Sequence, residues 1–285
     1  MIIPSSYEIN EGDLEGKVIL VTGANRGLGL ATTIDLARVG ATVIMLGRDI
    51  GSLEYAYDKV LDLGYKEPIL YPLDLEGATP EHYQELQDNI TTNFEKLDGL
   101  IHNAAILGTM MPIDQYDIRL WYSTLQINLS APFMLTQFLI PLLNKSEDAR
   151  ILFLSAEQGR DAKAYWGAYG VSKFGIEGFS KTLSEELEKT HIRVNSLDPG
   201  HMSTEMRRTA YPAEDSSKIP PPESKSPAIV YLMLPENSNI HGQKITISKP
   251  DEDLLEKKKM FMTVNDFTNI IEEELDVQRS IRNFN

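Results

Sequence analysis

Thr22-Gly23-Ala24-Asn25-Arg26-Gly27-Leu28-Gly29 lies between a β-rich run at residues 17–22 and residues 28–39, where apolar side chains recur at helical spacing. In such a position, glycines let the backbone turn tightly and approach a pyrophosphate, whose charge is met by the helix N-terminus. A glycine-rich turn without a ligand is the alternative, but the strand and helix around it favour a nucleotide site. The stretch therefore predicts a dinucleotide-binding βαβ unit.

The alternation of strand and helix continues along the chain. Short apolar runs, as expected of parallel strands buried on both faces, are separated by longer segments with helical periodicity. This pattern predicts an α/β protein with a doubly wound parallel sheet, a Rossmann fold, in a single domain. Further strands are expected at residues 41–46, 68–72, 99–102, 151–154, 193–197 and 243–247, and helices at 51–63, 80–94, 117–144 and 168–189.

Three segments depart from the alternation. Residues 1–14 are expected to be an N-terminal arm ahead of a Rossmann-fold domain at residues 15–249. Residues 201–227 hold several prolines and no sustained periodicity, and we interpret them as a substrate lid because long irregular insertions are commonly functional. The charged extension at 250–285 is expected to contain a short amphipathic C-terminal helix, because apolar residues between 264 and 275 fall on one helical face.

Composition excludes several classes of function. Hydrophobic residues make up 42% of the 285 residues, which suits a globular protein, and the net charge of -15 argues against nucleic-acid binding. Cysteine is absent, which excludes disulfides, and the five histidines show no paired ligand spacing, so no metal site is expected. Residues 1–6 do not resemble a signal peptide, and the apolar run at 131–143 is too short to span a bilayer. We therefore expect a cytoplasmic protein with no membrane partner.

Further motifs follow the glycine-rich turn in a fixed order. The turn itself has the spacing T-G-x-x-x-G-x-G. Together, the turn and the later motifs resemble the short-chain dehydrogenase/reductase (SDR) family over most of the chain. Residues 97–107 and 166–178 look most similar to YciK-type oxidoreductases, a bacterial branch of that family. The motifs are Asp74 after the third strand, His102-Asn103-Ala104-Ala105, Asn128, Tyr169-Gly170-Val171-Ser172-Lys173, and Pro199-Gly200 with Thr204.

The resemblance implies a nicotinamide cofactor, a small-molecule carbonyl or alcohol substrate, and a homodimer or homotetramer formed through helices near 120–143 and 168–187. Two positions depart from the family's usual Asn-Asn-Ala-Gly element, at His102 and Ala105. The residues that the resemblance assigns to cofactor binding are Gly23, Asn25, Arg26, Gly27, Leu28, Gly29, Arg48, Asp74, Leu75, Asn103, Ala104, Ala105, Tyr169, Lys173, Pro199, Gly200, Met202 and Thr204.

The end of the second strand indicates which nicotinamide is bound. Enzymes that prefer NAD carry an acidic residue there, which binds the ribose 2′-hydroxyl and would repel a 2′-phosphate. Gly47 occupies this position and Arg48 follows it, while Arg26 can reach the same phosphate from the glycine-rich turn. Two guanidinium groups suit a phosphate, so NADP(H) is predicted, although both arginines could be ordinary surface charges.

Hydride transfer to a carbonyl needs an acid for the developing alkoxide and a positioned cofactor. Tyr169 and Lys173 are four residues apart on a predicted helix, which places them on one face. By family resemblance Tyr169 is the acid/base, Lys173 lowers its pKa and holds the ribose, and Asn128 positions a water in a proton relay. The predicted activity is that of an NADP-dependent dehydrogenase/reductase acting on CH–OH and C=O groups.

The fourth family residue, a serine that hydrogen-bonds the substrate oxygen, is where the sequence departs. Counted from Gly159 or from Tyr169, its position is taken by Ala156, and Ser155 is the neighbour. Adjacent side chains at a strand end point to opposite faces. Either the loop is shifted by one residue and Ser155 hydrogen-bonds the substrate oxygen, or this hydrogen-bond donor is absent. The alternative function is therefore a catalytically weak or inactive NADP(H)-binding or sensing protein.

Overall fold

Eight parallel strands form one sheet in the computed structural model, which describes residues 1–3 and 9–247. Their order across the sheet is β1-β8-β7-β6-β5-β2-β3-β4. The doubly wound parallel sheet predicted from the alternation is confirmed. The strands are β1 (Ile2–Ile3), β2 (Val18–Thr22), β3 (Thr42–Gly47), β4 (Ile69–Pro72), β5 (Gly99–His102), β6 (Ala149–Leu154), β7 (Ile192–Asp198) and β8 (Lys244–Ile247).

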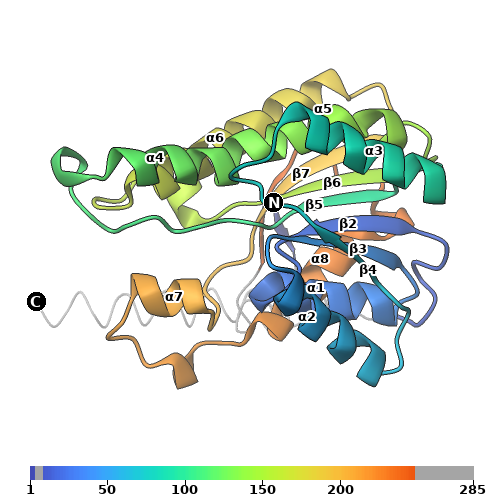
Figure 1. The fold of residues 1–285 in the computed structure, drawn as a ribbon, viewed down its shortest axis with the longest axis horizontal. Helices are drawn as coiled ribbons and strands as arrows, with labels where there is room; N and C mark the ends of the chain where they lie inside the picture. The colour runs from blue at the N-terminus through green and yellow to red at the C-terminus, as the bar shows by residue number, and fades with distance from the viewer. Residues whose placement is uncertain (4–8, 248–285) are drawn as a thin grey trace, which may run out of the picture. The chain divides into compact units, whose positions relative to one another are not determined.

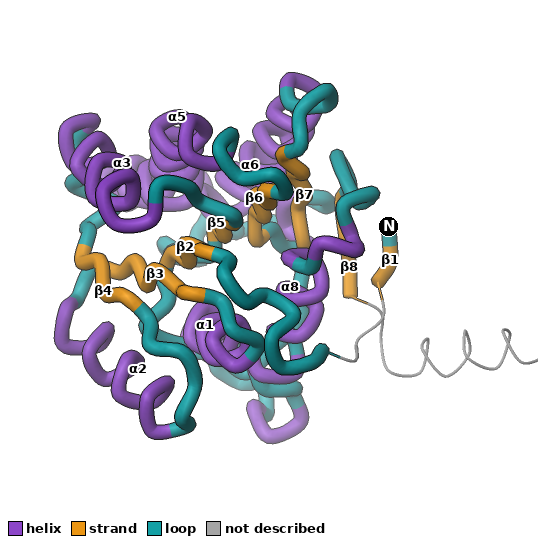
Figure 2. Tube along the Cα trace, turned by 90° about the vertical axis from the view of Figure 1, so that its right-hand side faces the viewer, coloured by secondary structure: helices purple, strands orange, loops and turns teal. Residues whose placement is uncertain are grey.

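Helices cover both faces of the sheet (Figures 1 and 2). One face carries α3, α5 and α6, and the other carries α1, α2 and α8. The central strands are buried on both sides, as their continuous apolar runs predict. The helices are α1 (Gly27–Arg38), α2 (Ile50–Asp62), α3 (Pro80–Phe94), α4 (Ile118–Leu125), α5 (Ala131–Leu143), α6 (Gly167–Glu186), α7 (Glu205–Ala210) and α8 (Ser226–Met233).

The long helix expected at 117–144 is interrupted by a π-helical turn at Gln126–Ser130, between α4 and α5. The whole stretch Ile118–Leu143 is long and apolar enough to cross a membrane by length and composition alone. However, Leu135, Leu139 and Leu142 are fully buried in the core on the α3–α5–α6 side of the sheet. Its apolar character is thus explained by packing on the sheet.

Three elements were not predicted from the sequence. The first is β1, in the expected N-terminal arm, whose Ile3 is buried and pairs with Ile247 of β8. The second is α7, within the expected lid; it is six residues long, and the Thr204 side chain caps it by accepting from the Arg207 amide at 3.2 Å. The third is α8, whose continuous apolar run shows no helical stripe because almost all its side chains are buried. The predicted C-terminal helix lies outside the described residues.

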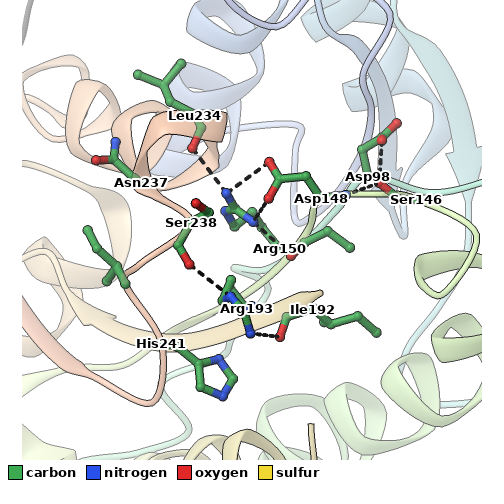
Figure 3. A network of polar contacts seen from close by, with 12 residues as sticks. Asp98, Ser146, Asp148, Arg150, Ile192, Arg193, Leu234, Asn237, Ser238 and His241 are labelled. Carbon is green, nitrogen blue, oxygen red and sulfur yellow. Dashed lines mark hydrogen bonds and ion pairs between the residues drawn. The ribbon is translucent and has the colours of Figure 1, made fainter. Parts of the chain in front are cut away.

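A network of polar contacts lies at the amino ends of β5 to β7 (Figure 3). Arg150 of β6 is 2% exposed, and its guanidinium donates to both Asp148 oxygens at 2.5 and 3.0 Å and to the Leu234 carbonyl at 3.3 Å. Arg193 of β7 donates to the Ser238 carbonyl at 2.9 Å. These contacts tie the strand starts to the segment after α8, at the end of the sheet opposite the predicted site.

The predicted site residues follow the carboxyl ends of the strands. In the sheet, chain connections leave in opposite directions from β2 and β5, which are neighbours. Ligands of open α/β sheets bind at such a switch point, outside the carboxyl ends of the strands. The loops after β2, β3, β4, β5, β6 and β7 carry many of the predicted residues, and the parallel topology brings these loops to one edge, while Asn128, Tyr169 and Lys173 lie on helical segments.

Candidate functional site

The glycine-rich turn joins β2 to α1 with almost no room for side chains. Gly23 and Gly27 have φ angles of +64° and +55°, which favour glycine. A Cβ on Gly29 would lie 2.1 Å from the Gly23 carbonyl oxygen. Leu28, by contrast, points into the core with 8% exposure. The turn is therefore shaped by backbone contacts, and the buried Leu28 side chain holds it against the core.

The turn is braced by the loop after β5. The Asn103 amide nitrogen Nδ2 donates to the carbonyls of Thr22 and Gly23 at 2.9 and 3.2 Å. In return, Thr22 Oγ1 accepts from the backbone N–H groups of Asn103 and Ala104, both at 2.9 Å. Asn103 and Ala104 thus shape the turn, and Ala105 follows them along the same loop. The role of Thr22 was missed, although its place before the first glycine was visible in the sequence.

Polar and basic groups gather at the end of β3, where the sequence predicts contact with a 2′-phosphate. Gly47 ends β3, and a Cβ there would lie 3.1 Å from the Leu53 side chain and 3.6 Å from the Asn25 side-chain oxygen, so this position is closely packed. Asn25 donates to Ser52 Oγ in the first turn of α2 at 3.0 Å, and Ser52 was not predicted. Arg48 is exposed beside them.

Arg26 does not point freely into this region, because its guanidinium forms an ion pair with Glu205 at the start of α7. Both side chains are mostly exposed. Thr204 lies close by, since a Cβ on Gly27 would be 3.6 Å from its methyl group. Helix α7 therefore contacts the glycine-rich turn, a contact that the sequence did not reveal.

The remaining predicted cofactor residues lie on the loops after β4 and β7. Asp74 is exposed and its carboxylate accepts from the Glu76 amide at 3.2 Å, while Leu75 is buried and its carbonyl accepts from Gln126. Gly200 has a φ of +73° and nothing within 4 Å of an added Cβ, which leaves open space beside it. Pro199 precedes Gly200, and Met202 and Thr204 follow it along the same loop. Met202 packs against the core.

Tyr169 and Lys173 lie one turn apart on α6, as their spacing predicts, and both are at least nine-tenths buried. The Lys173 ammonium lies 5.6 Å from the centre of the Tyr169 ring and donates to the Leu154 carbonyl at the end of β6, at 2.6 Å. Burial lowers the pKa of Lys173 to about 8, against the opposing charges of Asp198 and Glu177.

The pKa of Tyr169 differs from the expectation. The family resemblance implies that Lys173 lowers it, but burial raises the pKa of this phenol above its usual value, and the charge of Asp198 raises it further. The physical reason is the apolar surroundings of the ring, together with a lysine that donates to a carbonyl and not to the phenol. Tyr169 is therefore protonated at neutral pH.

Asn128 is held by the π-helical turn and is 2% exposed. Its Oδ1 accepts from the Ile106 amide at 2.8 Å, and its Nδ2 donates to the Ile106 carbonyl at 2.9 Å and to Ser172 Oγ at 3.1 Å. Ser172 in turn donates to the Tyr169 carbonyl at 2.7 Å. Asn128 thus connects the loop after β5 to the helix that carries Tyr169 and Lys173, and its predicted water relay stays a prediction.

Ser155 and Ala156 directly follow β6 and differ in their surroundings. Ser155 is 5% exposed, and its hydroxyl has no hydrogen-bond partner among the described residues, so it does not contact the Tyr169 hydroxyl. Ala156 packs against the cluster that contains Tyr169. Which of the two alternatives holds, Ser155 as the donor or loss of the donor, stays a prediction.

Asp198 was not predicted, although it directly precedes the Pro199-Gly200 motif. It ends β7, and its carboxylate accepts from the Gly200 amide at 2.9 Å. The Ser155 amide donates to the carbonyl of Leu197, the residue before it, at 2.8 Å. The negative charge of Asp198 raises the pKa of both Tyr169 and Lys173. A carboxylate therefore belongs to the electrostatic surroundings of the site.

The departure at His102 is structural. The imidazole is 4% exposed, stacks on Phe153 with ring centres 4.6 Å apart, and has Nε2 2.9 Å from Thr136 Oγ1. Burial lowers the pKa of His102 to about 3. The side chain is neutral and fills the core beneath Asn103.

Comparison with known proteins decides the family. A family model described as short chain dehydrogenase matches residues 17–215. The chain belongs to the short-chain dehydrogenase family. The uncharacterized oxidoreductase YciK of Escherichia coli K12 is 39% identical over 227 residues, which cover 80% of this chain and 90% of YciK. The similarity to YciK-type oxidoreductases is thereby confirmed.

Solved structures of the family agree with the fold. A short chain dehydrogenase from Pseudomonas syringae has 44% sequence identity and a TM-score of 0.83, covering 85% of this chain and 98% of its own. A second, from Shigella flexneri 2a and solved in complex with NADP, has 38% identity and a TM-score of 0.80, covering 84% and 98%. The family assignment makes this chain an oxidoreductase of the nicotinamide-dependent short-chain dehydrogenase type.

The residues present fit such a cofactor. The close approach of Gly29 to Gly23 leaves backbone N–H groups at the start of α1 free of side chains, as a pyrophosphate requires. Beside it, Gly47 carries no acidic side chain, and Asn25 and Arg48 carry donor groups. The open space at Gly200 lies on the loop that follows Asp198.

Proposed function

We propose that this protein is an NADP(H)-dependent oxidoreductase that transfers a hydride between the nicotinamide and a carbonyl or alcohol substrate. The observation that carries the proposal is the burial of Tyr169 and Lys173 on one face of α6, at the same sheet edge as the glycine-rich turn. A protonated phenol beside a buried lysine is what protonation of a developing alkoxide requires.

In the proposed reaction, the cofactor supplies the hydride. Tyr169, protonated at neutral pH because burial raises its pKa, donates its proton to the product oxygen during reduction. Lys173 remains largely charged below about pH 8 and offers a cation to the ribose and to the phenolate that Tyr169 becomes. Asn128 fixes the backbone of the loop after β5 against α6, which keeps both groups in place.

The preference for NADP(H) is supported by the absence of an acidic side chain at Gly47, by the neighbouring Arg48 and Asn25, and by the related structure that contains NADP. Fluorescence titration with NADPH and NADH tests it. NADPH should bind more tightly, and Arg48→Asp should remove the preference, because a carboxylate repels a 2′-phosphate. Equal affinities for the wild type, or an unchanged preference in the variant, would contradict the proposal.

A second candidate function is a catalytically weak NADP(H)-binding or sensing protein, and the packing of Ala156 on the Tyr169 cluster favours it. Turnover of a carbonyl panel with NADPH separates the two. Ala156→Ser restores an oxyanion donor and should raise kcat by about 10- to 100-fold, since one such donor is commonly worth about 100-fold or more. No turnover by either protein would favour the sensing function.

We also propose a homodimer or homotetramer formed through α4, α5 and α6. These helices expose five large apolar side chains, which a self-complementary interface would bury: Ile118, Tyr122, Phe133, Val171 and Phe174. Light scattering at micromolar concentration tests this, and a monomer would contradict it. The absence of nucleic-acid and membrane partners and the cytoplasmic location remain predictions of the sequence.

A further inference from the structure

An apolar cluster surrounds Tyr169 on the side away from the sheet. Its members come from four separate segments: the loop after β5, the loop after β6, the start of α6, and α7 with the residue that follows it. The three buried members are Leu107, Trp166 and Tyr169, and the residues packed against them are Met110, Ala156, Met206, Ala210 and Tyr211. This set is called the Trp166 cluster below.

Trp166 is at the centre of the cluster. Its ring centre lies 5.5 Å from that of Tyr169 and 6.0 Å from that of Tyr211, with tilted planes in both pairs. Ala156 contributes a methyl group where the family serine would contribute a hydroxyl. The surface that a substrate meets beside the Tyr169 hydroxyl is therefore aromatic and aliphatic.

Two cations beside the cluster, Arg207 and Lys163, are already paired with carboxylates. Arg207 lies 3.8 Å over the Tyr211 ring and donates to both Glu214 oxygens, at 2.6 and 2.7 Å. Lys163 pairs with Glu157 at 2.7 Å, and the same carboxylate lies 3.9 Å from His201. A substrate carboxylate or phosphate brought here would compete with Glu157 and Glu214 for these cations.

The closed packing sets the condition for binding. To bring an oxygen to Tyr169, the substrate must take the place of side chains such as Met206 or Tyr211, which now cover Trp166. An apolar ring restores the contacts that are lost, and stacking on Trp166 adds to them. A charged group would give up its hydration and would have to compete with Glu157 and Glu214 for Lys163 and Arg207.

We propose that the substrate is an uncharged carbonyl compound carrying an aromatic or alicyclic ring, which binds against Trp166 and displaces apolar side chains of the α7 segment. The inference rests on the proposed oxidoreductase function and narrows it. Carbonyl compounds that bear a carboxylate or phosphate on the ring are poor substrates.

The test compares matched pairs with NADPH: benzaldehyde against 4-carboxybenzaldehyde, and cyclohexanone against 4-oxocyclohexanecarboxylate. The uncharged member of each pair should have the larger kcat/KM by about 100-fold or more, since a hydrated carboxylate is left unpaired in the site. Met206→Lys should reduce this ratio at least about tenfold by supplying a partner. Leu63→Lys, which adds the same charge at an exposed site after α2, should leave the ratio unchanged.

A binding measurement separates failure of the inference from failure of the proposed function. In a Trp121→Phe background, Trp166 is the remaining tryptophan, and its fluorescence reports occupancy in the presence of NADP⁺, when the carbonyl compounds cannot be reduced. Quenching by the uncharged compounds without turnover with NADPH supports the inference and overturns the proposed function. Equal or faster turnover of the carboxylated members overturns the inference and supports the function. Neither quenching nor turnover overturns both.

Discussion

At the amino ends of β5 to β7, the buried charges of Asp98 and Arg150 pair with opposite charges, whereas at the carboxyl ends of the same strands the buried Lys173 ammonium forms no ion pair among the described residues. Arg150 is paired with Asp148 at one end, and at the other end Ser155 Oγ has no partner among the described residues. The Lys173 pKa is lowered to about 8 at that same end. We infer that the ion pairs at the amino ends stabilise the sheet, while the polar groups at the carboxyl ends stay available for a ligand.

The largest effect at the carboxyl ends is expected for Tyr169→Phe. The variant should lose about 1,000-fold or more in kcat, because the proton donor is gone, while NADPH affinity and the midpoint of thermal unfolding stay nearly unchanged. Steady-state kinetics, fluorescence titration and calorimetry measure the three quantities. A variant that unfolds several degrees lower would show that Tyr169 also stabilises the fold, which would blur the distinction between the two ends.

The counterpart at the amino ends is Arg150→Met. Removing this 2% exposed guanidinium leaves Asp148 and the Leu234 carbonyl without their donor, and the free energy of unfolding should fall by about 3 kcal/mol. NADPH affinity should not change. Lys218→Met is the control, since its pair with Asp215 is exposed and should contribute almost nothing. Loss of NADPH binding in folded Arg150→Met would contradict the division between the ends.

His102 gives a prediction for pH. Its folded pKa of about 3 lies below the unfolded value of 6.5, so the unfolded chain binds the extra proton and stability falls as pH drops below about 6.5. His102→Asn should remove this contribution, which amounts to roughly 2 to 3 kcal/mol between pH 7 and 4.5. Urea unfolding of both proteins at each pH measures it. Parallel losses of stability in the two proteins would show that the imidazole is already charged when folded.

The smallest predicted effect concerns the ion pair between Arg26 and Glu205. Glu205→Gln should free Arg26 for a 2′-phosphate and strengthen NADPH binding about two- to fivefold at low salt, the range expected for an exposed pair. NADH affinity should stay the same, and the gain should disappear at high salt. Equal gains for both cofactors would show that the change acts on the glycine-rich turn and not on the phosphate.

Sequence patterns predicted the core of the fold well, because buried parallel strands and the helices between them have strong local signals. Residues 80–94 and 99–102, for example, match α3 and β5 to the residue. The two-residue strand β1 has no such signal, since it depends on pairing with β8 at the far end of the domain. Helix α7 was missed because six residues are too few to show a period.

For the site, motifs placed most cofactor residues on the correct loops, but they could not show contacts between distant segments. The pairing of Arg26 with Glu205 and the meeting of Trp166 with Tyr211 each join segments far apart in the chain. Asp198 was overlooked because the motif begins at the next residue. The sequence alone does not decide between Ser155 and Ala156, since a shift of one residue changes which side chain reaches a given face.

The pairing of β1 with β8 also constrains how the chain folds. The Met1 ammonium donates to the Lys244 carbonyl at 2.9 Å across a separation of 243 positions. On the ribosome, Ile2 and Ile3 are therefore made long before their partners Thr246 and Ile247. Closing so long a loop is entropically costly, and it is repaid only when the rest of the sheet is in place. Ile2 and Ile3 thus join the sheet only after β8 has been made, although they are synthesised long before it.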